Sequence, residues 1–316
     1  LDLRFPFDLL VRDVNAVEPN TNDTLLSLER LKVELRLWKL LKKEVEIEEI
    51  SIRNATFDTR DFIDGVVVNG HLGELYLESH GVVFSPETAR INEFSVKNTD
   101  VSLTLENMED TDTTTAEPIY WKILLDEIDF ENVGFALNMP QDSLFVRTML
   151  PKTTLKDGVI DLKEASYYVK SFDMDNAELA YGPKEELSLK KIGLQLDSIY
   201  YCGRDIRANI EEFVFKERSG LELVSTEGRI ASDSVLIQIP KFTMKTTASS
   251  LDLQTKIGWD VLEMKKTGVL SAKINAEIGK GDVAKILGGR DTLFLQTYPN
   301  KPFVFRADAE GDLKRL

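Results

Sequence analysis

Cysteine and histidine are almost absent from this chain of 316 residues, which contains one cysteine and two histidines. Metal sites and cysteine- or histidine-based catalysis depend on these side chains, so the composition argues against both. The lone Cys202 also excludes an intramolecular disulfide, which fits the cytosol and equally a large periplasmic protein. We therefore expect a protein that is not an enzyme and that uses no cofactor or metal.

Long apolar runs and an excess of basic charge are lacking as well. No stretch approaches the ~18 apolar residues that a membrane-spanning helix needs, and residues 1–6 do not resemble a signal peptide. The 39 Lys and Arg residues are outnumbered by 54 Asp and Glu, giving a net charge of −15, which disfavours nucleic acid as a partner. Because the sequence begins inside a strand-like pattern, we expect a fragment of a longer protein.

Apolar and polar residues alternate along most of the chain, for example in residues 101–106 and 235–239. This period of two is typical of a strand with one face on apolar material and the other in water. Short helices are expected only at residues 38–43 and at 282–287, the latter ending at two glycines. The sequence therefore predicts a mainly β fold, an elongated, curved, antiparallel-rich sheet with an apolar inner face and one or two short helices.

A repeated motif interrupts the alternation. The order apolar-x-x-apolar-x-apolar-x-Asn occurs in Ile47–Asn54, Ile91–Asn98, Leu125–Asn132 and Val169–Asn176, and a fifth copy, Ile210–Lys216, is followed by Glu217 instead. After the motif the apolar residues resume with the other parity, which a bulge or bend inside the strand would produce. Asparagine tolerates the left-handed conformation. We therefore predict structural corners at Asn54, Asn98, Asn132 and Asn176.

A sheet with one apolar face must cover it with a second sheet, close on itself, or leave an apolar trough open to a ligand. An acyl chain suits a long trough, because burying each CH₂ is worth about 0.8 kcal/mol. Alternation alone does not distinguish an open groove from a sealed core, and either parity could line the groove. The candidate lining residues are Ile50, Ile52, Phe57, Phe94, Val96, Val101, Leu103, Ile128, Phe130, Phe135, Leu137, Phe172, Met174, Leu179, Phe213, Phe215, Leu221 and Leu223.

Residues 23–33 and 37–50 resemble the N-terminal region of the AsmA/TamB superfamily, in which a strand leads into a short basic, leucine-containing helical turn and then into a strand of I-x-x-I-x-L-x-N type. Residues 215–223 and 237–251 are similar to TamB-type (translocation and assembly module) proteins of the Bacteroidetes, and residues 268–283 fit a further unit of the same kind. The resemblance covers essentially the whole chain. It consists of degenerate hydrophobic patterns and includes no catalytic signature.

This resemblance implies a "β-taco", a curved sheet with a greasy interior, in the periplasm. It implies a segment of a lipid conduit for outer-membrane biogenesis, with phospholipid acyl chains as the cargo. Anchoring in the inner membrane by an N-terminal helix and contact with a TamA-like outer-membrane barrel protein would use regions absent from this sequence. The expected organisation is a first AsmA-like β unit at 1–108, a polar loop at 109–118, a second β unit continuing the same sheet at 119–265, and the start of a truncated third unit at 266–316.

Two other functions stay open. A periplasmic scaffold or chaperone could present its sheet edges to outer-membrane barrel proteins during assembly or secretion, by strand augmentation. An enzyme acting on surface polysaccharide or lipid would need a converging cluster of carboxylates, which the sequence does not display. Bound lipid would favour the conduit, and crosslinks from edge strands to unfolded barrel proteins would favour the scaffold.

Overall fold

The structure, a computed structural model, describes residues 2–4, 8–19, 23–35, 47–60, 65–84, 87–106, 120–263, 268–288, 290 and 292–312. The strands are β1 (Asp2–Arg4), β2 (Asp8–Val17), β3 (Thr24–Leu35), β4 (Ile47–Asp58), β5 (Val66–Phe84), β6 (Glu87–Leu105), β7 (Lys122–Met139), β8 (Leu144–Asp161), β9 (Ser166–Tyr181), β10 (Leu187–Cys202), β11 (Asp205–Glu217), β12 (Glu222–Ser232), β13 (Leu236–Thr246), β14 (Ser250–Gly258), β15 (Val269–Ile278) and β16 (Phe303–Asp312). The helices are α2 (Trp259–Leu262), α3 (Lys280–Leu287) and α4 (Thr292–Thr297).

Two compact units divide the chain. Unit 1 comprises Leu1–Glu164 and Asp175–Ser188, and unit 2 comprises Ala165–Met174 and Leu189–Leu316. Strands β9 and β10 contribute residues to both units, and each unit is described by itself below. The domain boundaries predicted at residues 108, 118 and 265 stay a prediction.

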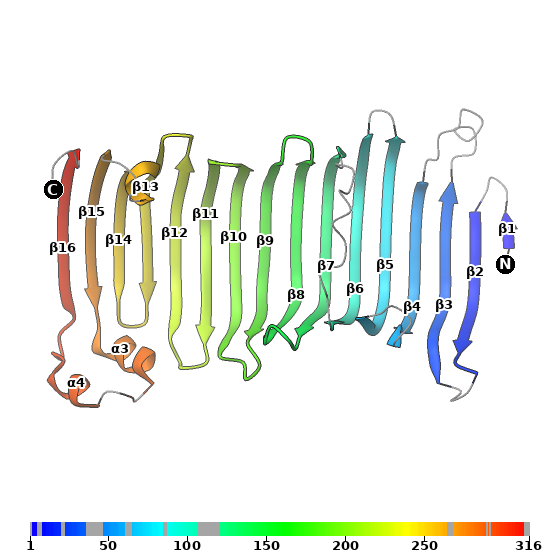
Figure 1. The fold of residues 1–316 in the computed structure, drawn as a ribbon, viewed down its shortest axis with the longest axis horizontal. Helices are drawn as coiled ribbons and strands as arrows, with labels where there is room; N and C mark the ends of the chain where they lie inside the picture. The colour runs from blue at the N-terminus through cyan, green and yellow to red at the C-terminus, as the bar shows by residue number, and fades with distance from the viewer. Residues whose placement is uncertain are drawn as a thin grey trace. The chain divides into compact units, whose positions relative to one another are not determined.

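In unit 1 the strands β1 to β8 lie in chain order, each beside its sequence neighbours (Figure 1). Their pairs are antiparallel, except that β6 and β7 run parallel from the pair Thr88 and Lys122 to the pair Thr104 and Asn138. Within the described residues of the unit, β1 and β8 do not pair with each other. The sheet of this unit is therefore open.

In unit 2 the strands β10 to β16 also follow chain order, and all their pairs are antiparallel (Figure 1). Helix α2 follows β14, while α3 and α4 lie in the connection from β15 to β16. Helix α3 ends at Gly288, whose φ of 55° is the left-handed conformation that glycine adopts without strain. The sequence predicted this helix and its stop, but it did not predict α2 or α4.

The prediction of a mainly β, antiparallel-rich open sheet with one or two short helices is confirmed, and the described residues contain three such helices. The predicted helical turn at residues 38–43 and the polar loop at 109–118 lie outside the described residues. No helix in the described part of the chain is both long and apolar enough to cross a membrane.

The described residues bury very few apolar side chains. Those less than 9% exposed are Leu10, Ala55, Val96, Leu125, Ala177, Ile192 and Leu223. The accessible surface is 20615 Å², whereas a compact protein of this mass would expose about 13,000 Å² and two separate compact halves about 16,000 Å². The strands therefore gain stability mainly from hydrogen bonds and side-chain contacts with their neighbours within the sheet, and a sealed two-layer core is not present in the described residues.

Candidate functional site

Apolar side chains stand in unbroken rows across the strands of unit 1. Cross-strand partners point to the same face of a sheet, so a row of paired residues occupies one face. One row, from β2 to β8, consists of Leu9, Val33, Ile50, Leu77, Phe94, Ile128 and Leu155. The next row consists of Val11, Leu31, Ile52, Leu75, Val96, Phe130 and Thr153. The two rows make one continuous apolar surface, which we call the apolar face.

Further along the same strands the apolar rows resume. A third row consists of Ala16, Leu26, Phe57, Gly70, Val101, Phe135 and Thr148, and a fourth contains Val68, Leu103, Leu137 and Val146. The structure thus brings together the predicted lining residues of β4, β6 and β7. The sequence analysis did not name the lining residues of β2, β3, β5 and β8, although these strands alternate in the same way.

A line of bends separates the two sets of rows. Asp13, Asn54, Asn98 and Asn132 have φ of 51°, 46°, 51° and 53°, the left-handed conformation. The pairing skips each of these left-handed residues and resumes beyond it in the same register, and the apolar residues change parity at this level. Opposite these bends, Glu29 of β3, Gly73 of β5 and Pro151 of β8 are likewise skipped in the cross-strand pairing.

The remaining predicted residues lie on later strands. On β9, Asn176 has φ of 54° and belongs with Leu179 to unit 1, whereas Phe172 and Met174 belong to unit 2. Within unit 2, Phe213 pairs with Leu194 of β10.

The fifth copy of the motif has a different structure. Its strand ends at Glu217, whose N–H donates to the oxygen of Leu221 at 2.7 Å and closes a hairpin, so that Phe215 and Leu223 pair across it. The other four copies bend inside a strand.

Unit 2 carries its own apolar rows, which the sequence analysis did not list. One row consists of Phe242, Leu253, Ile274 and Ala307, and its neighbour consists of Met244, Leu251, Ala276 and Phe305. These residues come from strands that lack the asparagine motif. Their period-two alternation was the signal that could have found them.

The predicted lining residues are neither sealed nor fully exposed. Of the eighteen, Val96 and Leu223 are buried, Phe135 is 38% exposed, and the remaining fifteen are half-buried. Phe94 and Phe130 touch edge to face, with ring centroids 6.2 Å apart. Most of these side chains are thus partly covered by their neighbours in the sheet and partly accessible, as expected for an apolar surface without a covering layer.

The opposite face of unit 1 is highly charged. One of its rows is acidic and consists of Asp8, Glu34, Glu49, Glu78, Glu93, Glu127 and Lys156, whereas another is mainly basic and consists of Arg12, Arg30, Arg53, Glu74, Lys97, Glu131 and Lys152. Burial, a hydrogen bond to Glu78 and the charges of Glu78, Glu49 and Glu93 together raise the pKa of Tyr76 to about 12. The two faces of the sheet therefore differ sharply in polarity.

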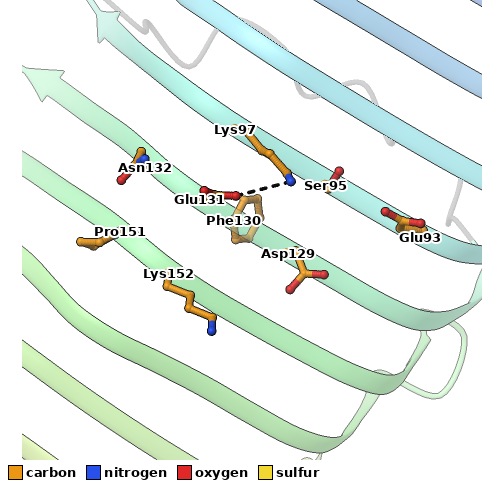
Figure 2. A pocket seen from close by; sticks show the side chains of 9 residues that line it. All are labelled: Glu93, Ser95, Lys97, Asp129, Phe130, Glu131, Asn132, Pro151 and Lys152. Carbon is orange, nitrogen blue, oxygen red and sulfur yellow. Dashed lines mark ion pairs between the residues drawn. The ribbon is translucent and has the colours of Figure 1, made fainter.

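Two hollows lie beside the corner asparagines. One, of 440 Å³, is lined by Glu93, Ser95, Lys97, Asp129, Phe130, Glu131, Asn132, Pro151 and Lys152. Figure 2 shows the ion pair between Lys97 and Glu131 across it, 3.4 Å long. The other, of 470 Å³, includes Glu29, Asn54 and His71, and the His71 Nδ1 lies 3.3 Å from the Thr56 hydroxyl.

The chemistry of these hollows is that of paired surface charges. Lys97 and Glu131 neutralise each other, and Asn54 donates to the Glu29 carboxylate. In the described part of the chain, no group of three or more His, Cys, Asp or Glu side chains is arranged to hold a metal ion. The apolar face is therefore the better candidate for a functional surface.

No family model matches the chain, and no curated protein matches it either.

Proposed function

We propose that this chain is a non-enzymatic, periplasmic segment of a bridge-like lipid conduit, in which phospholipid acyl chains slide along the apolar face on their way between the inner and outer membranes. The observation that carries the proposal is the set of apolar rows, which continue from strand to strand and consist mostly of half-buried side chains. A lipid with ~30 methylenes would gain about 24 kcal/mol from full burial of its tails. A continuous apolar surface supplies part of that free energy at each step.

The resemblance to the AsmA/TamB superfamily supplies the setting of this proposal. In that setting the chain belongs to an inner-membrane-anchored cell-envelope protein and works with a TamA-like outer-membrane barrel protein in outer-membrane biogenesis. An uncharged, weakly selective surface suits a cargo that has to keep moving, since tight local sites would hold it.

The test compares charged substitutions on the two faces. Phe130→Asp or Phe94→Asp places a carboxylate among apolar rows, whereas Ala136→Asp places one on the polar face of β7 between Ser102 and Arg147. Native mass spectrometry should reveal co-purifying phospholipid in the unmodified chain and in Ala136→Asp, and about tenfold less in the Phe variants. Circular dichroism should show all of them folded. Absence of lipid from the unmodified chain, or unfolding of both Phe variants but not of Ala136→Asp, would count against an open lipid surface.

A second candidate function is a scaffold or chaperone for outer-membrane barrel proteins. It is favoured by β16, which pairs with β15 along ten residues and has no strand on its other side among the described residues. An unpaired strand edge can accept another strand through main-chain hydrogen bonds. Photo-crosslinkers in β16 that capture unfolded barrel proteins, in a chain that contains no lipid, would favour this function over the first.

A further inference from the structure

Exposed apolar side chains concentrate at one place in unit 2. The surface is formed by Ile278, Ile286, Leu293, Phe294, Phe303 and Phe305, and we call it the helical tip. Leu293 is 75% exposed and Ile286 69% exposed, more than any other large apolar side chain among the described residues. Single exposed apolar residues are ordinary, but a cluster of this size marks a contact surface.

The parts of the helical tip are joined by specific contacts. Ile278 pairs with Phe303 across β15 and β16, and the Tyr298 hydroxyl donates to the oxygen of Ile278 at 2.8 Å. The Tyr298 ring also contacts the Phe294 ring edge to face, with 5.7 Å between ring centroids. The backbone carbonyl oxygen of Tyr298 accepts a hydrogen bond from Lys280 Nζ at 3.2 Å. These contacts join the start of α3 and helix α4 to the end of β15 and the start of β16, and Figure 1 shows both helices at that end of the two strands.

A buried carboxylate holds α3 in place. Asp282 is 3% exposed, and its carboxylate accepts hydrogen bonds from the hydroxyl of Thr246, the last residue of β13, and from those of Thr247 and Ser249 in the connection to β14. Because these hydrogen bonds fix α3, Ile286 on the same helix is held in its exposed position.

The charge of this region is opposite to that of the chain. Residues 280–301 contain four Lys or Arg and two Asp, so 4 − 2 gives +2 in a chain whose net charge is −15. One of the two aspartates is the buried Asp282, while Arg290 and Lys301 are exposed. Leucine, isoleucine and phenylalanine flanked by basic side chains make up the composition of protein segments that lie in the interface of anionic membranes.

We infer that the helical tip docks onto an anionic lipid surface, with Ile286, Leu293 and Phe294 inserted among the headgroups and Arg290 and Lys301 facing lipid phosphates. The inference goes beyond the proposed function, because a chain could bind a membrane here whether or not its apolar face carries lipid. If both proposals hold, the membrane contact lies beside Phe305, the last residue of one apolar row of unit 2.

The experiment is co-sedimentation of the full chain with vesicles of phosphatidylcholine alone or with an added phosphatidylglycerol fraction. We expect binding to the anionic vesicles that weakens with salt. The double substitution Leu293→Asp and Phe294→Asp should reduce the affinity at least about tenfold, a loss of ~1.4 kcal/mol. Ile286→Asp should also reduce it, and since this side chain lies outside the Phe294–Tyr298 ring contact, it tests the surface if the double variant misfolds. Val235→Asp, at a site 66% exposed in the same unit, is the matched control and should bind normally.

A third variant separates charge from insertion. Arg290→Gln with Lys301→Gln should abolish the preference for anionic vesicles while leaving weak binding to phosphatidylcholine. The inference is overturned if the chain binds neither kind of vesicle, if Leu293→Asp/Phe294→Asp binds like the control, or if that variant loses self-association, which would make the tip an interface between copies. Phe130→Asp should still bind vesicles when it has lost its co-purifying lipid, so the two proposals can fail separately.

Discussion

Asn98 and Asn132 lie side by side on the parallel strands β6 and β7, and the Asn132 Nδ2 donates to the Asn98 Oδ1 at 3.3 Å. Both residues have left-handed backbones, with φ of 51° and 53°. Because β6 and β7 are parallel and in register, their two bends coincide, and the apolar rows on either side keep their alignment. The bend is thus shared by neighbouring strands.

Asn132→Ala should lower the free energy of unfolding by about 1 kcal/mol, because alanine pays that much in the left-handed conformation and lacks the short polar side chain with which asparagine offsets the cost by local hydrogen bonding. Asn132→Gly should be nearly neutral, since glycine adopts this conformation freely. Asn138 of the same strand has ordinary extended backbone and is the matched control, with the reverse order expected: there glycine costs more than alanine. Urea unfolding measures all four variants. Equal effects of alanine and glycine at position 132 would show that the bend does not depend on the backbone conformation of that residue.

Only some of these bends could be predicted from the sequence. The three-residue offset between Ile52 and Ala55, with an asparagine between them, was visible in the sequence and led to the corner positions. In β2 the left-handed residue is Asp13, and at the same level β8 has Pro151, so no common residue type reveals the line of bends. A bend that is completed by pairing with a neighbouring strand needs no particular side chain of its own.

Register was beyond sequence reasoning for a related reason. Copies of the motif at Ile91–Asn98 and Leu125–Asn132 look alike whether their strands are parallel or antiparallel, because alternation has no direction. The acidic row from Asp8 to Glu127 appears only after the strands are aligned. Helix α4 was missed because its six residues, Thr292–Thr297, are too few to display a helical period.

Glu93 stands directly between Glu78 and Glu127, and like charges opposite each other destabilise a sheet. We expect Glu93→Gln to raise the free energy of unfolding by about 0.5 kcal/mol at low salt. The gain should shrink as salt screens the charges of the unmodified chain. Urea unfolding at low and high salt measures both effects. Glu277→Gln is the control, since Glu277 lies between the neutral Ser250 and Val304 and should change little at either salt concentration. A loss of stability in Glu93→Gln would mean that the charged Glu93 carboxylate makes a favourable interaction that outweighs its repulsion by Glu78 and Glu127.

The buried Asp282 gives a prediction about pH. Burial works to raise the pKa of its carboxyl, but hydrogen bonds from Ser249 and Thr246 and the charge of Lys285 outweigh burial, and the pKa is lowered from the ordinary value of 3.8. A carboxyl with a depressed pKa in the folded state contributes stability above its unfolded-state pKa and loses it as pH falls through the folded-state pKa. Asp282→Asn should therefore cost about 2 kcal/mol at neutral pH, and the difference from the unmodified chain should shrink below about pH 3.8.

The measurement is urea unfolding of both chains from neutral to acid pH, followed by far-UV circular dichroism. Asp260→Asn is the control, because Asp260 is exposed in helix α2, at the other end of β14 from the hydroxyls that bind Asp282, and its replacement should leave the curve unchanged. Taking the difference between chains removes the titration of the other carboxylates, which both share. If Asp282→Asn lost the same stability at every pH, the negative charge of Asp282 would contribute nothing to the stability of the folded chain. The anchoring of α3 would then depend only on uncharged interactions of this side chain.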